Sequence, residues 1–273
     1  MAFFENYSDV VNQLQAFGLV VDELRVDTTR PVRCGVDLGL CPVDNAKRKS
    51  AGWYHLASFV VDSKTYIVGA FGFWKGADNN LQKVEWDKTV TVTPEQKKAQ
   101  AERFKQMKIA SEKARAEEIE AASRRAVWVW SKYTRQGQCD YLDRKQVGAH
   151  GVRFGPKDTV AVPVANASGK IFGLQFIRSD AAIKGTKKIQ KKFEPQGMAI
   201  SGHFHLIGQP REVCLIAEGY ATAATLHEVT GLPVAVAFNA NNLTPVAKEI
   251  KKHYPNAVIV VCADDDYLQK CTQ

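Results

Sequence analysis

The stretch that decides the fold, residues 213–266, reads VCLIAEGYATAATLHEVTGLPVAVAFNANNLTPVAKEIKKHYPNAVIVVCADDD. Three short apolar runs alternate with two segments of helical pattern, and the first of these segments stops at Gly231. Apolar strands that alternate with helices and end at polar residues are typical of a parallel sheet covered on both faces. We therefore predict an α/β sheet domain over residues 211–273.

Acidic residues follow the first and the third of these runs. Glu218 comes directly after VCLIA, and Asp264, Asp265 and Asp266 come after the last run. Parallel sheets bind ligands at the carboxyl ends of their strands, and alternation points Asp264 and Asp266 to the same side. One acid at a strand end is more often a solvated loop residue, whereas three converging carboxylates repel one another unless a cation lies between them. We predict that Glu218, Asp264 and Asp266 bind Mg²⁺ or Mn²⁺, which prefer oxygen ligands.

The segments IAEGYATA (216–223) and VVCADDD (260–266) resemble the Toprim fold. Bacterial-type primases, type IA and type II topoisomerases, and some nucleases and recombination proteins share this fold. The resemblance implies that Glu218 takes part in acid/base or metal-linked chemistry and that Asp264 and Asp266 bind Mg²⁺. All three are therefore expected to be catalytic. Gly219 is expected to let the backbone turn sharply behind the glutamate.

The region before this core resembles bacterial-type primases. YLDRKQV (141–147) is similar to the segment that opens their polymerase part, and VAVPVANASGKIFGLQFI (160–177) is similar to their basic subdomain. HFHLIG (203–208) also has a counterpart there. The N-terminal stretches SAGWYHL and GAFGFWKG are similar to primases of prophages and conjugative plasmids. The resemblance covers most of the chain and is strongest over residues 141–266. It implies a nucleotidyltransferase that makes short RNA primers from NTPs on single-stranded DNA, with a replicative helicase as a further partner.

The chain is basic, with a formal net charge of +8. Residues 144–192 hold eleven Lys and Arg against two acids, which suits a polyanionic partner. Because the lysine run lies between two segments that resemble primases, we expect it to contact nucleotide and template phosphates. A solvated surface loop would explain the same run equally well. The residues assigned to nucleotide and template binding are Arg178, Lys184, Lys187, Lys188, Lys191 and Lys192.

Four segments are expected, so the protein is multi-domain and α+β overall. They are an aromatic-rich α+β module (1–92), a long charged helix (93–136), a basic subdomain (137–210) and the Toprim core (211–273). The first contains a helix and a β-meander. The long helix starts after Thr93, and its apolar end, 126–130, is expected to dock on the next domain. The basic subdomain contains a β-hairpin at 159–178. The core is expected to be cut short, because related primases continue beyond the Asp-x-Asp pattern.

The cysteine spacing argues against a zinc module. Cys34, Cys41 and His55 are irregularly spaced and have no fourth ligand nearby, so zinc is not expected. Several N-terminal aromatic residues either stack on template bases or form an ordinary core: Trp53, Tyr54, Phe71, Phe73 and Trp74. The chain opens with no secretory segment and holds no apolar stretch of about 20 residues. We therefore expect a cytoplasmic protein without a membrane partner.

Two other functions fit the same residues. One is an inactive fragment that binds single-stranded DNA, and the other is a Toprim-type metal-dependent nuclease.

The few residues after Asp266 cannot supply a covering helix and a further strand. We therefore expect the strand before Asp264 to lie at the edge of the sheet and the metal to bind weakly.

Overall fold

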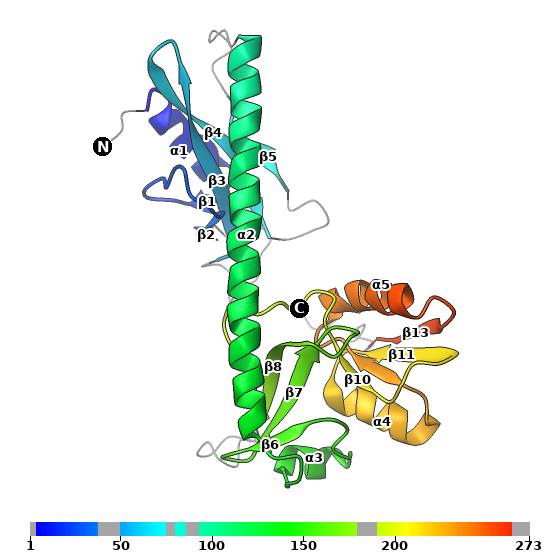
Figure 1. The fold of residues 1–273 in the computed structure, drawn as a ribbon. Helices are drawn as coiled ribbons and strands as arrows, with labels where there is room; N and C mark the ends of the chain where they lie inside the picture. Colours follow the sequence, from blue (N-terminus) through cyan, green and yellow to red (C-terminus); the bar gives the residue numbers. More distant parts are fainter. Residues whose placement is uncertain (1–3, 38–49, 75–79, 86–92, 179–189, 264–273) are drawn as a thin grey trace, which may run out of the picture. The chain divides into compact units, whose positions relative to one another are not determined.

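The computed structural model describes residues 4–37, 50–74, 80–85, 93–178 and 190–263. The chain divides into two compact units, residues 1–114 and 115–273, and each has its own hydrophobic clusters. Both units combine helices with sheets (Figure 1), so the protein has the mixed α/β character that the sequence predicts. The finer division into four segments stays a prediction.

The first unit contains a five-stranded antiparallel sheet whose strands follow one another in chain order. Its elements are α1 (Tyr7–Ala16), β1 (Leu19–Val20), β2 (Val32–Val36), β3 (Gly52–Val61), β4 (Lys64–Phe73) and β5 (Gln82–Lys83). Asp62 and Ser63 join β3 to β4 with positive φ values of 49° and 66°. Two consecutive left-handed residues give a turn that matches the twist of a β-hairpin. The structure thus contains the predicted helix and β-meander.

Both faces of this sheet are covered, so most of its aromatic residues belong to the core. Leu14 of α1 packs with Tyr54 and Leu56 on one face, whereas Phe104 of the following helix packs with Phe59 on the other. Of the five aromatic residues considered for base stacking, only Trp74 is substantially exposed, at 45%. The other four are at most 8% exposed, which favours the core interpretation: Trp53, Tyr54, Phe71 and Phe73.

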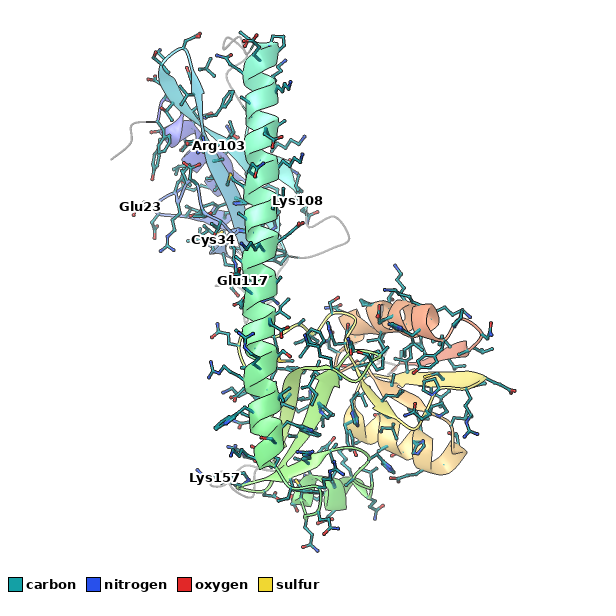
Figure 2. The ribbon with its side chains drawn as sticks, viewed as in Figure 1. Glu23, Cys34, Arg103, Lys108, Glu117 and Lys157 are labelled. Carbon is teal, nitrogen blue, oxygen red and sulfur yellow. The ribbon has the colours of Figure 1, made fainter. Side chains whose placement is uncertain are left out.

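One helix, α2 (Pro94–Lys132), spans 39 residues and begins where the sequence predicts. A capping box holds its first turn. Thr93 Oγ1 accepts a hydrogen bond from the Gln96 amide at 3.2 Å, and Gln96 Oε1 accepts one from the Thr93 amide at 2.8 Å. Side chains project along its whole length, among them Lys108 and Glu117 (Figure 2). Among the residues described, no helix combines the length and apolar character needed to cross a lipid bilayer.

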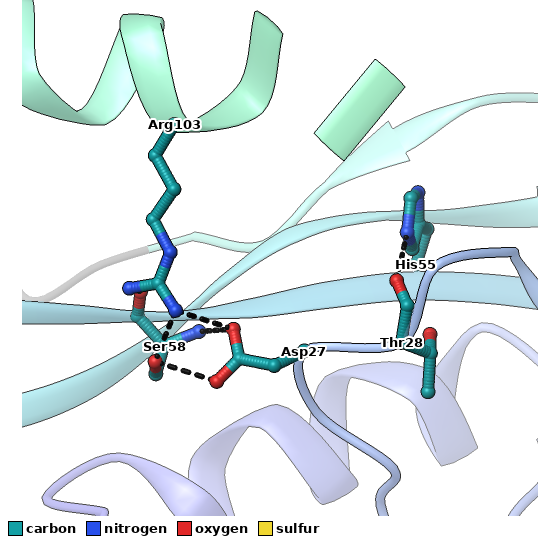
Figure 3. A network of polar contacts seen from close by, with 5 residues as sticks. All are labelled: Asp27, Thr28, His55, Ser58 and Arg103. Atoms are coloured by element: carbon teal, nitrogen blue, oxygen red, sulfur yellow. Dashed lines mark hydrogen bonds and ion pairs between the residues drawn. The ribbon is translucent and has the colours of Figure 1, made fainter. Parts of the chain in front are cut away.

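Arg103 attaches the first part of α2 to the sheet of the first unit (Figure 3). Its guanidinium donates to the Ser58 carbonyl oxygen at 2.6 Å and to Asp27 Oδ1 at 2.9 Å. Asp27 also accepts hydrogen bonds from the Ser58 amide and hydroxyl, at 2.9 and 2.7 Å. Nearby, His55 Nε2 lies 2.8 Å from the Thr28 carbonyl oxygen, so this candidate zinc ligand has a backbone partner.

The last turns of α2 belong to the second unit and bury only one side of the helix. Ala122 and Ala126, four residues apart, are buried. The prediction that the whole apolar end of the helix docks is wrong for Val127 and Trp128, which are 47% and 65% exposed. A helix can bury only one stripe, and the small alanines occupy that stripe.

The first sheet of the second unit is antiparallel, in the order β6-β7-β8-β9. Its strands are β6 (Arg153–Gly155), β7 (Thr159–Ala165), β8 (Ile171–Arg178) and β9 (Gln190–Glu194), and the short helix α3 (Asp140–Lys145) precedes them. β7 and β8 form the predicted hairpin. Gly169 in their turn has a φ of 80°, which glycine adopts without strain.

The second sheet has the order β10-β12-β11-β13. Its strands are β10 (His205–Ile207), β11 (Val213–Ala217), β12 (Val234–Val236) and β13 (Val258–Cys262). β11 runs parallel to β12 and β13, as the sequence predicts, whereas β10 runs antiparallel to β12. Among the described strands, β13 lies at the edge of this sheet, the position expected for the strand before Asp264.

Two helices cover opposite faces of this sheet (Figure 1): α4 (Tyr220–Thr230) and α5 (Leu243–His253). A short 3₁₀ helix, Ala240–Asn242, leads into α5. Ala223 of α4 packs in the same cluster as Leu215, whereas Ile250 of α5 packs with Ile216. Because neighbouring residues of β11 point to opposite faces, an uninterrupted apolar run is what a sheet covered on both faces needs.

Candidate active site

The topology of the second sheet singles out the carboxyl end of β11, which lies between β12 and β13. The chain passes from β11 through α4 to β12 on one side, and then through α5 to β13 on the other side. Connections that depart in opposite directions leave a crevice beyond the strand ends, where α/β sheets bind ligands. Glu218 lies at this switch point, because it directly follows Ala217, which pairs with Cys262 of β13.

Gly219 follows Glu218 and forms the N-cap of α4. Its φ of −107° and ψ of 152° are extended values that any residue adopts. The prediction that a sharp turn requires glycine here is therefore wrong. A Cβ atom at Gly219 would lie 3.9 Å from both Lys191 Nζ and Thr222 Oγ1, an ordinary contact distance. Without a side chain, Gly219 leaves the first turn of α4 open beside Glu218.

Strand β9 brings Lys191 to this point. The Lys191 ammonium lies 3.9 Å from the position that a Cβ atom would take at Gly219, the residue after Glu218. Phe193 points to the same side of β9, and its ring packs edge-on against Phe238 with 5.8 Å between the centroids. Phe238 follows β12. One face of β9 therefore covers the carboxyl ends of β11 and β12.

Phe238 is a second sign of a functional site, and nothing in the sequence pattern reveals it. Its φ of 71° lies in the left-handed region, which is unfavourable for a bulky side chain. Such a conformation costs about 1–3 kcal/mol and persists where packing enforces it, often at functional sites. The Phe238 side chain is only 8% exposed, so the surrounding core holds it in place.

Arg178 and Lys192 lie on the opposite face of the antiparallel sheet from Lys191. Lys192 pairs across the strands with Phe176, whereas Lys191 pairs with Ile177, so their side chains point in opposite directions. Arg178 shares the face of Phe176, whose ring packs on that of Tyr133, the residue after α2. The Nε atom of Arg178 donates a hydrogen bond to Thr159 Oγ1 at 3.0 Å. Of the three described residues assigned to nucleotide and template binding, only Lys191 faces the end of β11.

The remaining predicted site residues lie outside the described residues: Lys184, Lys187, Lys188, Asp264 and Asp266. The described chain ends at Ala263, directly after β13. Within the described ranges, no three His, Cys, Asp or Glu side chains are grouped as metal ligands would be. The assignment of Mg²⁺ or Mn²⁺ to Glu218, Asp264 and Asp266 therefore stays a prediction.

A polar network that the sequence does not predict fixes α4, the helix that begins after Glu218. His150 Nε2 lies 2.6 Å from Glu228 Oε1, which also accepts a hydrogen bond from the Gly148 amide at 2.7 Å. The Tyr220 hydroxyl donates to the Gly148 carbonyl oxygen at 2.9 Å and accepts from the His150 amide at 2.7 Å. His205 Nε2 lies 2.7 Å from the His150 carbonyl oxygen. The loop after α3 is thereby attached to both ends of α4.

His205 makes the stability of the second unit depend on pH. Burial lowers the pKa of His205 from 6.5 to about 4. Below about pH 6.5 the unfolded chain takes up a proton that folded His205 excludes, so the free energy of unfolding falls as the pH drops towards 4. Between about pH 7.5 and about pH 5 we expect a loss of about 2 kcal/mol. Urea denaturation at these two pH values measures the loss.

His205→Gln is expected to remove this part of the pH dependence, because glutamine can donate to the His150 carbonyl oxygen but does not titrate. Two neighbours titrate independently of the change. Burial also lowers the pKa of His203, and the hydrogen bond from His150 lowers the pKa of Glu228 below its usual 4.5. An equal loss of stability in the wild-type protein and the glutamine variant would contradict a buried neutral His205.

Comparisons with known proteins give partial matches. No protein-family model matches the chain. A DNA primase TraC of Escherichia coli is 33% identical over 117 residues, which cover 41% of this chain and 10% of that protein. A second DNA primase TraC of Escherichia coli is 34% identical over 132 residues, covering 46% of this chain and 9% of its own length. The chain thus spans about a tenth of the curated relatives it matches. Over less than half of its length, the chain is similar to DNA primases.

Proposed function

We propose that this chain is the catalytic part of a Toprim-type DNA primase, which makes short RNA primers on single-stranded DNA. The observation that carries the proposal is the position of Lys191 at the switch point of the parallel sheet, where its ammonium lies near Gly219, the residue after Glu218. A carboxylate suited to a divalent cation, beside an ammonium suited to a phosphate, is a pair that nucleotidyl transfer needs. The partial similarity to DNA primases TraC supports the same reaction.

In this reaction the 3′ hydroxyl of the primer attacks the α-phosphate of an NTP. A new P–O bond forms, the hydroxyl proton passes to solvent, the bond to the β-phosphate breaks, and pyrophosphate leaves with the electron pair. The triphosphate brings several negative charges to the site. Lys191 offsets part of that charge, because its ammonium lies near Gly219, the residue after Glu218.

Glu218, together with Asp264 and Asp266, would hold Mg²⁺ or Mn²⁺. The donor chemistry fits, because Glu218 offers carboxylate oxygens from a half-buried position at the strand end. When bound, the cation would stabilise negative charge on the attacking and leaving oxygens. We expect weak affinity without nucleotide, since Mg²⁺ keeps several waters and is held in part by substrate phosphates.

The proposal makes single-stranded DNA and NTPs the substrates and a replicative helicase a further partner in the cytoplasm. Incubation of the full chain with single-stranded DNA, labelled NTPs and Mg²⁺ or Mn²⁺ tests it. Short labelled RNA that depends on template and metal is the expected product. Binding of DNA without new RNA would instead indicate an inactive binding fragment, and a shortened template would indicate a nuclease. Either of these two results would overturn the proposed function.

A further inference from the structure

The C-terminal turns of α2 present an aromatic ring to solvent. Trp128 is 65% exposed, although tryptophan is usually among the more buried residues of a fold. The neighbouring Trp130 is engaged, because the Arg153 guanidinium lies 4.6 Å from its ring centroid and donates to its carbonyl oxygen at 2.6 Å. The exposure of Trp128 is thus a property of its helix face and not of the whole segment.

Positive side chains surround this ring. Arg124 and Arg125 lie one turn before Trp128, and Lys132 lies one turn after it, so the helix puts all four residues on neighbouring positions of one face. All three cations are exposed, and Lys132 Nζ lies 5.8 Å from the ring centroid of Trp128. We refer to Arg124, Arg125, Trp128 and Lys132 as the Trp128 face.

Acidic side chains are missing from this part of the sequence. Residues 121–139 contain four Lys and Arg and no Asp or Glu. The acid that precedes them, Glu120, pairs with Lys170 at 2.7 Å, which offsets its charge. The Trp128 face therefore combines a flat apolar ring with positive charge at both of its sides.

We infer that the Trp128 face binds single-stranded DNA, with a base stacked on the indole and phosphates beside Arg124, Arg125 and Lys132. Exposed bases offer the aromatic faces that a tryptophan stacks on, and the backbone offers the negative charge that the cations complement. A duplex hides its base faces, so it fits this surface less well. The choice of single-stranded DNA rests on the proposed function, for which this face would be an additional template contact.

Fluorescence anisotropy with a labelled oligothymidine, the full chain, and neither NTP nor metal tests this inference. Trp128→Ala is expected to weaken binding about tenfold, since stacking on one aromatic ring has an effect of about that size. Trp128→Phe, which keeps a ring, is expected to retain most of the affinity. Val229→Ala on α4 is the matched control, because Val229 is also exposed, at 79%, and lies in the same unit.

The positive charges are tested through salt dependence. Each phosphate contact on a single strand contributes about 0.7 to the slope of log affinity against log salt. Arg124→Gln combined with Arg125→Gln is therefore expected to flatten the slope by about 1.4 units. Lys248→Gln combined with Lys252→Gln removes two exposed charges from α5 and is expected to leave the slope unchanged.

Unchanged binding by Trp128→Ala would overturn the inference, and so would an equal loss in the alanine and phenylalanine variants. Tighter binding of duplex than of single strand would also overturn it. A change of oligomeric state in Trp128→Ala, measured by light scattering, would assign the face to a contact between copies of the chain. Because no NTP or metal is present, these results are independent of primer synthesis, and a failure of either proposal is recognised separately.

Discussion

Glu218→Gln is expected to lower primer synthesis at least about a hundredfold while leaving the fold intact. Glutamine has nearly the same shape but lacks the negative charge that a metal ligand supplies. The loss of one electrostatic contact to the reacting groups typically costs about two to three orders of magnitude in rate. Glu218 is half-buried at the end of β11 and adjoins the first turn of α4, so the substitution removes charge without opening a cavity.

Glu249→Gln serves as the control for this variant. Glu249 is another acid of the second unit. It lies on α5, where its Oε1 is 2.9 Å from His253 Nε2, and it is not among the residues assigned to the site. Primer yield from single-stranded DNA and labelled NTPs is measured for both variants, with circular dichroism as a check of folding. Full primer synthesis by Glu218→Gln would remove the glutamate from the site, and an equal loss in both variants would point to a general effect of charge.

Lys191→Met is expected to reduce kcat/KM for the NTP by about tenfold or more, whereas Lys192→Met is expected to stay within about twofold of the wild type. The Lys191 ammonium lies near Gly219 at the carboxyl end of β11, where the triphosphate is proposed to bind. Lys192 points to the other side of β9 and forms an ion pair with Glu194, with 72% of its side chain exposed. Exposed ion pairs contribute little, about 0–1 kcal/mol, so the loss of Lys192 should matter little.

These two adjacent residues form a matched pair, since both changes remove one lysine charge from the same short strand. A nonspecific role of the basic segment predicts equal losses, whereas a site at the switch point predicts a loss for Lys191 alone. Steady-state kinetics at constant ionic strength distinguish the two, because salt screening affects both variants alike. Equal effects of the two substitutions would contradict the assignment of Lys191 to the site.

Local patterns predict much of the second sheet. The three apolar runs become β11, β12 and β13, and the helix between the first two stops at Gly231, whose φ of 68° is the left-handed value typical of a helix end. The antiparallel edge strand β10 could not be predicted in the same way. It precedes β11 in the chain but pairs with β12, and such a long-range pairing leaves no local signal.

The site shows the same division between local and long-range information. Glu218 could be proposed from its place after an apolar run, whereas the difference between Lys191 and Lys192 depends on the register of β9 against β8 and on its packing over β11. The contact between His150 and Glu228 joins residues 78 positions apart, so spacing cannot reveal it. Helical periodicity, by contrast, separates Trp128 from the stripe of Ala122 and Ala126, so the exposure of Trp128 follows from local spacing alone.

Binding of Mn²⁺ measured by electron paramagnetic resonance, with an NTP present, tests most directly whether Glu218 marks a metal site at this switch point. The method reports the cation itself and requires no turnover. We predict that the wild-type chain binds Mn²⁺ with weak affinity, that Glu218→Gln binds it at least about tenfold more weakly, and that Asp264→Asn combined with Asp266→Asn gives a similar loss. Equal Mn²⁺ affinity in the wild-type chain and in Glu218→Gln would contradict a metal site at the carboxyl end of β11.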